Sequence, residues 1–136
     1  VEENNTVGDT KAVEYTAKVV SWKYAEIDEA DRKVIISDES KLKELYERYN
    51  VYGDLVEWSE SYFSNYDEKF FESKSLAIEY VTLSSSNQSV DLKKATKEGN
   101  SVKIEYDIKS IGDVGAAVMM ADLIVVEVDK DVTSII

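Results

Sequence analysis

Two segments in the second half of the chain consist almost entirely of apolar and β-branched residues. Residues 75–83 (SLAIEYVTL) have a nearly continuous apolar centre, and residues 122–128 (DLIVVEV) form the most apolar strand candidate. Short apolar runs of this kind, bounded by polar clusters, predict buried β-strands. Both are well below the roughly 18 residues that a membrane-spanning helix needs. The chain is therefore expected to be rich in β-structure, with no membrane-spanning segment.

Four further segments predict strands. Residues 13–24 alternate between apolar and polar, and the alternation breaks at Val19-Val20, which indicates a bulge or a strand that passes into a second environment. Residues 33–36 (KVII) predict a short strand that forms a hairpin with residues 13–24. Residues 90–96 and 101–108 alternate on either side of a loop that contains one glycine, and they predict a second hairpin.

One segment has the period of an amphipathic helix. Residues 38–49 begin with two acidic residues, which favour the positive end of the helix dipole, and Ser37 is placed to cap the first turn. The apolar stripe of this helix consists of Leu42, Leu45, Tyr46 and Tyr49. A short helical turn is expected over residues 65–71, and residues 111–121, which contain two glycines, are expected to form a crossing loop or short turn.

These elements predict an α+β fold with about six mostly antiparallel strands in one curled sheet, packed with one main helix over about residues 38–49. Residues 1–11 are polar and without periodicity, so we expect a flexible leader followed by a single domain over residues 12–136. The polar start without methionine is typical of a secreted or lipid-anchored protein whose signal segment was removed. A chain cut at an arbitrary point would give the same pattern.

The composition argues against several classes of function. A net charge of -12 disfavours nucleic acid and anionic lipid, and favours basic proteins, cations or neutral surfaces as partners. The chain has no histidine and no cysteine, which excludes Ser-His-Asp catalysis, imidazole and thiolate metal sites, and disulfides. Its five glycines form no phosphate-binding loop. We therefore expect a protein that is not an enzyme and holds neither a metal nor a cofactor.

Acidic side chains leave two alternatives open. Paired carboxylates could act as a hydrolase if two of them faced each other across a cleft, and Glu57 and Glu60 are one such close pair. Calcium prefers oxygen ligands, and residues 28–31 (DEAD) carry three carboxylates. However, 28 acidic residues in a chain of 136 cluster by chance, and residues 28–31 lack the spacing of a calcium loop. A solvated hairpin tip is the favoured interpretation of that segment.

The candidate binding residues lie in an aromatic stretch and in a polar turn. Trp58, Tyr62 and Phe63 belong to a segment whose rings could bind a carbohydrate or a protein groove, or could pack into the core of a small sheet. The core interpretation is favoured, with one or two rings left exposed. Residues 84–89 (SSSNQS) predict a polar turn, and residues 111–118 a third contact surface. In the turn, the predicted contacts are Ser85, Ser86 and Asn87.

Several of these motifs occur together in a known pattern. Residues 66–71 (YDEKFF) lead into the strand at residues 75–78, a serine-rich turn follows, and residues 119–130 (MMADLIVVEVDK) close the domain. Over about residues 60–130 the chain resembles small lipoproteins and secreted proteins of Gram-positive gut bacteria. It is also similar to the C-terminal domain of the protease-complex accessory subunit PrcB. The Thr-Gly-Gly-Tyr turn of that subunit has no counterpart here, because residues 84–89 stand in its place.

The resemblance implies an extracellular or cell-surface protein with no catalytic residues to carry over, and with a lipid anchor upstream of Val1 as one option. The leading hypothesis is a non-catalytic protein-interaction domain that binds another envelope or secreted protein through strand edges or loops, as an accessory or stabilising partner of a protease. The alternative is a module that binds a small ligand or carbohydrate through exposed aromatic rings.

Overall fold

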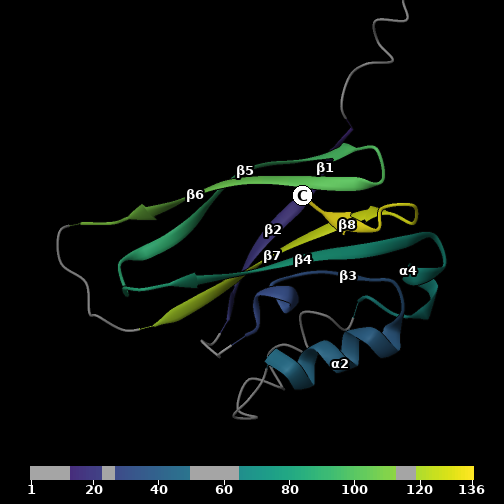
Figure 1. The fold of residues 1–136 in the computed structure, drawn as a ribbon, viewed down its shortest axis with the longest axis horizontal. Helices are drawn as coiled ribbons and strands as arrows, with labels where there is room; N and C mark the ends of the chain where they lie inside the picture. Colours follow the sequence, from purple (N-terminus) through teal and green to yellow (C-terminus); the bar gives the residue numbers. More distant parts are fainter. Residues whose placement is uncertain (1–12, 23–26, 50–64, 113–118) are drawn as a thin grey trace, which may run out of the picture.

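A computed structural model describes residues 13–22, 27–49, 65–112 and 119–136 of the chain (Figure 1). These residues are mostly β-structure with one main helix. The strands are β1 (Glu14–Tyr15), β2 (Ala17–Trp22), β3 (Lys33–Ile36), β4 (Lys74–Leu83), β5 (Gln88–Glu98), β6 (Ser101–Ser110), β7 (Met120–Asp129) and β8 (Ser134–Ile135). The helices are α2 (Glu39–Tyr49), the shorter α4 (Glu68–Ser73) and one 3-10 turn, η1 (Glu29–Asp31).

The strands form two four-stranded sheets. The first has the order β2-β7-β4-β3 and is antiparallel throughout, and the second has the order β1-β5-β6-β8, in which only the β6·β8 pair is parallel. The prediction of about six strands in one curled sheet is therefore wrong. A single sheet packed with the helix would expose the other face of its most apolar strands to water, and the second sheet covers that face.

β4 and β7 are buried on both faces, which explains their continuous apolar sequences. They pair antiparallel in the middle of the first sheet, from Lys74 opposite Asp129 to Leu83 opposite Met120. Successive side chains of a strand point to opposite faces. One set packs with α2 and α4 and includes Leu76, Ile78, Tyr80, Leu123 and Val125. The other set packs with the second sheet and includes Ala77, Val81, Leu83, Ile124, Val126 and Val128.

The N-terminal strand changes sheets at Thr16. Tyr15 pairs with Ala95 of β5 in the second sheet, whereas Ala17 pairs with Val126 of β7 in the first. The predicted passage into a second environment therefore occurs, but three residues before the break at Val19. The predicted hairpin between residues 13–24 and 33–36 is wrong. β2 and β3 lie at opposite edges of the first sheet because β7 and β4, the most apolar strands, occupy the places between them.

Both helices begin at an aspartate that accepts a capping hydrogen bond. The Asp38 carboxylate accepts from the amide of Lys41 at 2.8 Å, and this bond and the one from Ser40 lower the pKa of Asp38. The helix predicted over residues 38–49 is confirmed, but Asp38 makes this capping bond instead of Ser37. The predicted turn at residues 65–71 corresponds to α4, where Asp67 accepts from the amide of Phe70 at 3.1 Å.

The hairpin predicted from residues 90–96 and 101–108 is confirmed as β5 and β6, although both strands are longer than predicted. Gly99 in the connecting turn has a φ of +62°, which only a residue without a Cβ adopts readily. A β-bulge interrupts the ladder between Leu92 and Lys94, so Lys93 is one extra residue on β5. The bulge is important for the site described below.

None of the helices in the described ranges has the length and apolar character needed to cross a lipid bilayer. The predicted leader, residues 1–11, lies outside those ranges, and the division of the chain into leader and single domain stays a prediction.

The two-faced burial of β4 can be tested by truncating one of its side chains. Leu76 is 0% exposed, so Leu76→Ala is expected to lower the free energy of unfolding by about 2–5 kcal/mol, through lost burial and a residual cavity. Val19→Ala on β2, where the side chain is 38% exposed, should cost less than about 1 kcal/mol. Urea unfolding followed by circular dichroism measures both. Equal losses would contradict the described packing.

Candidate functional site

β5 is much longer than β1, the strand on one side of it. β1 contains only Glu14 and Tyr15, which pair with Thr96 and Ala95 of β5. The preceding part of β5, residues 88–94, has no strand on this side among the residues that the structure describes. On the other side of the sheet, β6 is paired with β8 only at Ser101 and Val102. An unpaired strand edge is a place where another extended chain can be added.

The hydrogen-bond pattern shows which backbone groups of this stretch point outward. The Ile111 amide donates to the Asn87 carbonyl at 2.8 Å, which extends the β5·β6 ladder by one pair beyond Gln88. Hydrogen-bonded pairs alternate along an antiparallel ladder, so the backbone groups of Gln88, Val90 and Leu92 point away from β6. The Gln88 amide bonds to the Ser85 carbonyl at 3.2 Å, and the Val90 amide donates to the Asp122 carboxylate of β7. Among the described residues, this leaves the edge open at Leu92.

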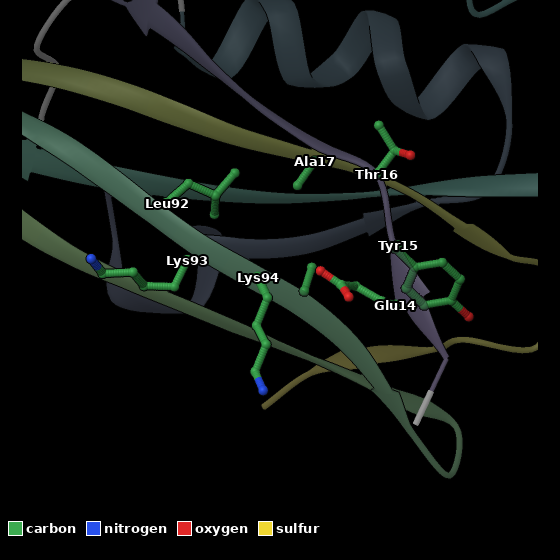
Figure 2. A pocket seen from close by; sticks show the side chains of 8 residues that line it. Glu14, Tyr15, Thr16, Ala17, Leu92, Lys93 and Lys94 are labelled. Carbon is green, nitrogen blue, oxygen red and sulfur yellow. The ribbon is translucent and has the colours of Figure 1, made fainter. Parts of the chain in front are cut away.

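A pocket of about 460 Å³ adjoins this edge (Figure 2). It lies between the point where the N-terminal strand changes sheets and the bulge of β5. The lining residues are Glu14, Tyr15, Thr16, Ala17, Leu92, Lys93, Lys94 and Ala95. Figure 2 shows Leu92 extending toward β2 while Lys93 and Lys94 extend away from it. The pocket therefore has an apolar side, at Leu92 and Ala17, and a cationic rim.

The charge of the hairpin differs from that of the whole chain. Residues 88–110 contain five lysines and four acidic residues, a net charge of +1, whereas the chain carries -12. The side chains of Lys93 and Lys94 are 51% and 52% exposed. Lys93 pairs with Asp91 at 2.6 Å and Lys94 with Glu105 at 3.8 Å. Exposed pairs of this kind contribute about 0–1 kcal/mol, so both ammonium groups can exchange these partners for a ligand at small cost.

Two contacts connect β1 and β5 with the end of β7 and the turn that follows it. The Tyr15 hydroxyl donates to the Asp129 carboxylate at 2.9 Å, and the Lys97 ammonium lies 2.9 Å from Asp131. Burial and the bond to Asp129 raise the pKa of Tyr15, so the phenol stays a donor at neutral pH. These contacts lie beside Thr16, where the N-terminal strand leaves β5, and so they border the end of the pocket that Glu14 and Tyr15 line.

Two buried carboxylates lie between the sheets. Glu79 on β4 and Asp122 on β7 are 7% and 8% exposed, on the face that packs against the second sheet. The Tyr106 hydroxyl of β6 donates to Glu79 at 3.0 Å, and burial with the nearby Glu79 charge raises the pKa of Tyr106 to about 12. Burial also raises the pKa of both carboxyls, against the opposing effects of Tyr106 and Lys33 on Glu79 and of the Val90 amide on Asp122. Such enclosed groups link the sheets and offer little surface to a substrate.

The predicted turn contacts shape a loop. The Ser85 hydroxyl donates to the Asn87 side-chain carbonyl at 2.6 Å, and the Asn87 amide group donates to the Gly112 carbonyl at 3.3 Å. Ser86 is exposed at the tip. The turn thus contacts the start of the predicted surface at residues 111–118, so two of the three predicted surfaces meet. Whether Ser85, Ser86 and Asn87 contact a partner stays a prediction.

The remaining predicted contacts, Trp58, Tyr62 and Phe63, lie outside the described ranges, as do Glu57 and Glu60. Residues 29–31 form η1. Within the described part of the chain, no group of three or more acidic side chains is arranged to hold a metal ion.

The edge of β5 was missed at the sequence level, although the sequence does carry a signal for it. Val90 and Leu92 alternate with polar residues, and the alternation then fails at Lys93-Lys94 before it resumes with the buried Ala95. Two polar residues in succession within an alternating strand indicate a bulge. The shortness of β1 has no comparable signal, because it depends on which sheet the following residues join.

No family model, curated protein or solved structure matches this chain.

The buried carboxyls predict an unusual pH dependence. Because burial raises both pKa values in the folded state, the folded protein takes up protons before the unfolded chain does. Stability from these groups therefore grows as the pH falls from 7 toward their ordinary pKa values, 4.5 for Glu79 and 3.8 for Asp122. It is lost again as the pH rises through the raised values, at no more than about 1.4 kcal/mol per pH unit for each group.

The measurement is urea unfolding at pH 7, 6 and 5. The double variant Glu79→Gln/Asp122→Asn is expected to reduce the gain in unfolding free energy between pH 7 and pH 5. Glutamine at position 79 can still accept the Tyr106 hydrogen bond. Glu105→Gln/Asp107→Asn removes the same charge from the outer side of β6 and should leave the increase in place. Identical pH profiles for the two double variants would show that Glu79 and Asp122 do not cause the gain in stability at lower pH.

Proposed function

We propose that this chain is a non-catalytic protein-interaction domain that binds an extended segment of a partner protein along the open edge of β5. The observation that carries the proposal is the combination of an unpaired strand edge at Leu92 with the adjoining pocket. An added strand obtains backbone hydrogen bonds from the edge, and a pocket beside it accepts a side chain and so provides specificity.

The local structure protects part of this edge from pairing and leaves Leu92 beside the pocket accessible to a ligand. Proteins protect exposed strands with lysines, bulges, inward charges, proline, or a covering helix or loop. This edge has the bulge with its two lysines, and the inward Asp122 carboxylate accepts from the Val90 amide. The inward side chains here are Val90 and Leu92, both apolar and half-buried, and the chain contains no proline. The lysines of the bulge point outward and border the edge without covering it.

The proposed partner is another envelope or secreted protein, and the proposed role is that of an accessory or stabilising partner of a protease. This part of the proposal is supported by the resemblance of residues 60–130 to the PrcB C-terminal domain. The alternative, a carbohydrate-binding module, depends on Trp58 and Tyr62, which lie outside the described ranges, and no observed contact favours it over strand addition.

The proposed location has a direct test. Fractionation of the source organism, followed by immunoblotting, is expected to find the protein in the envelope fraction or the culture medium. Recovery with a cytosolic marker only would contradict the location, while leaving the binding of an extended segment open to its own test.

Binding itself is tested with displayed random peptides selected against the immobilised domain. A selected peptide is expected to slow hydrogen exchange at the Leu92 amide, measured by NMR, because strand addition gives this outward amide an acceptor. Ala17→Trp, which fills the pocket, should weaken binding about tenfold or more, whereas Val19→Trp, on the same strand outside the pocket lining, should not. A peptide that binds without protecting Leu92, or that binds Ala17→Trp equally well, would contradict the proposal.

A further inference from the structure

We infer that the segment bound at the β5 edge runs antiparallel to β5 and contains an acidic residue immediately before an apolar one. The inference rests on the proposed function and specifies the chemistry of the partner at the same site. The direction of β1 indicates the direction of the segment, the pocket beside Leu92 indicates the apolar residue, and the two lysines of the bulge indicate the acidic one.

The direction follows from the path that β1 leaves vacant. β1 runs antiparallel to β5 and turns away to the first sheet at Thr16, directly after Tyr15 pairs with Ala95. A segment that continues the same line pairs next with Lys94 and then proceeds toward Val90. It therefore runs in the direction of β1, and antiparallel pairing is also slightly the more stable arrangement per residue.

The apolar residue is the one opposite Leu92. Side chains of directly paired residues lie on the same face of a sheet, so this residue points inward with Leu92. There it meets the pocket, whose apolar side is formed by Leu92, Ala17 and Ala95. An apolar side chain at this position packs against these three residues, whose side chains offer no hydrogen bond to a polar one.

The acidic residue is the neighbour that lies opposite the bulge. Successive side chains alternate, so it points to the outer face, where the ammonium groups of Lys93 and Lys94 are half exposed. Glu14 contributes one negative charge to the pocket lining and the two lysines contribute two positive ones. An acidic residue of the segment would take the place of Asp91 or Glu105 as a partner of these lysines. Because the segment runs from the bulge toward Leu92, the acidic residue precedes the apolar one.

The test uses three synthetic nine-residue peptides with alanine and threonine flanks and the central pairs Glu-Leu, Lys-Leu and Glu-Ser. Their affinities for the purified full chain are measured by fluorescence anisotropy at low salt. The Glu-Leu peptide is expected to bind about three- to tenfold more tightly than the Lys-Leu peptide, the range given by one or two exposed ion pairs. The Glu-Ser peptide is expected to bind more weakly than the Glu-Leu peptide.

Lys93→Gln/Lys94→Gln is expected to abolish the preference for Glu-Leu over Lys-Leu without abolishing binding. The matched control, Lys103→Gln/Lys109→Gln, removes the same charge from β6 of the same hairpin and should keep the preference. Circular dichroism verifies that both variants are folded. A preference that survives in Lys93→Gln/Lys94→Gln, or that disappears equally in the control, would overturn the inference.

The two levels of the proposal fail differently. If peptides protect the Leu92 amide but show no preference for the acidic residue, this inference fails and the proposed function stands. If none of the selected or designed peptides protects that amide, the proposed function fails and this inference fails with it.

Asp91-Leu92 of β5 has the inferred order itself, so a second copy of the chain is a competing ligand. Concentration-dependent dimers that protect Leu92 and exclude the Glu-Leu peptide would identify the second copy as the occupant and overturn the choice of a partner protein.

Discussion

The antiparallel pairing of β4 with β7 is the interaction on which the rest of this structure depends. Each strand has ten residues, and the ladder runs along their full length. Both faces of the pair are apolar, so each face requires a covering layer, at a gain of about 25 cal/mol for each Å² of apolar surface removed from water. Leu76 and Leu123 require the helical layer, whereas Val81 and Val126 require a second sheet. A three-layer arrangement follows from the composition of these two strands.

The open edge of β5 is a consequence of how the second sheet is connected to the first. The N-terminal strand pairs with both sheets, so it has to leave β5 before β5 ends, and the crossing at Thr16 leaves residues 88–94 without a neighbour on that side in the described structure. The bulge at Lys93 lies at the same point and turns the two lysines outward. The pocket is therefore produced by the crossing and the bulge together, and beside the crossing Tyr15 and Lys97 contact the end of β7 and the turn that follows it.

Patterns within a single strand or helix predicted the elements well, because they depend on local sequence. The amphipathic stripe containing Leu42 and Leu45 located α2, and alternation located β5 and β6. Pairing between distant segments was predicted poorly. Residues 13–24 and 33–36 are neighbours among the strand candidates, yet β7 and β4 separate them in the sheet. The candidate site depends on that long-range pairing. Local sequence therefore predicted contacts at the turn serines but did not predict the edge at Leu92.

The distribution of charge explains how an acidic protein could accept an acidic ligand segment. Long-range attraction, set by the net charge of -12, favours basic partners, but charges separated by more than about 8 Å are largely screened at physiological salt. Specificity at contact is set by the groups within that distance, which include the ammonium groups of Lys93 and Lys94 and their exchangeable partners Asp91 and Glu105. The net charge predicts slow association with an acidic partner, and the local charge predicts which residue of the partner is retained once it is bound. A partner that is basic overall and presents one acidic residue beside an apolar one satisfies both requirements.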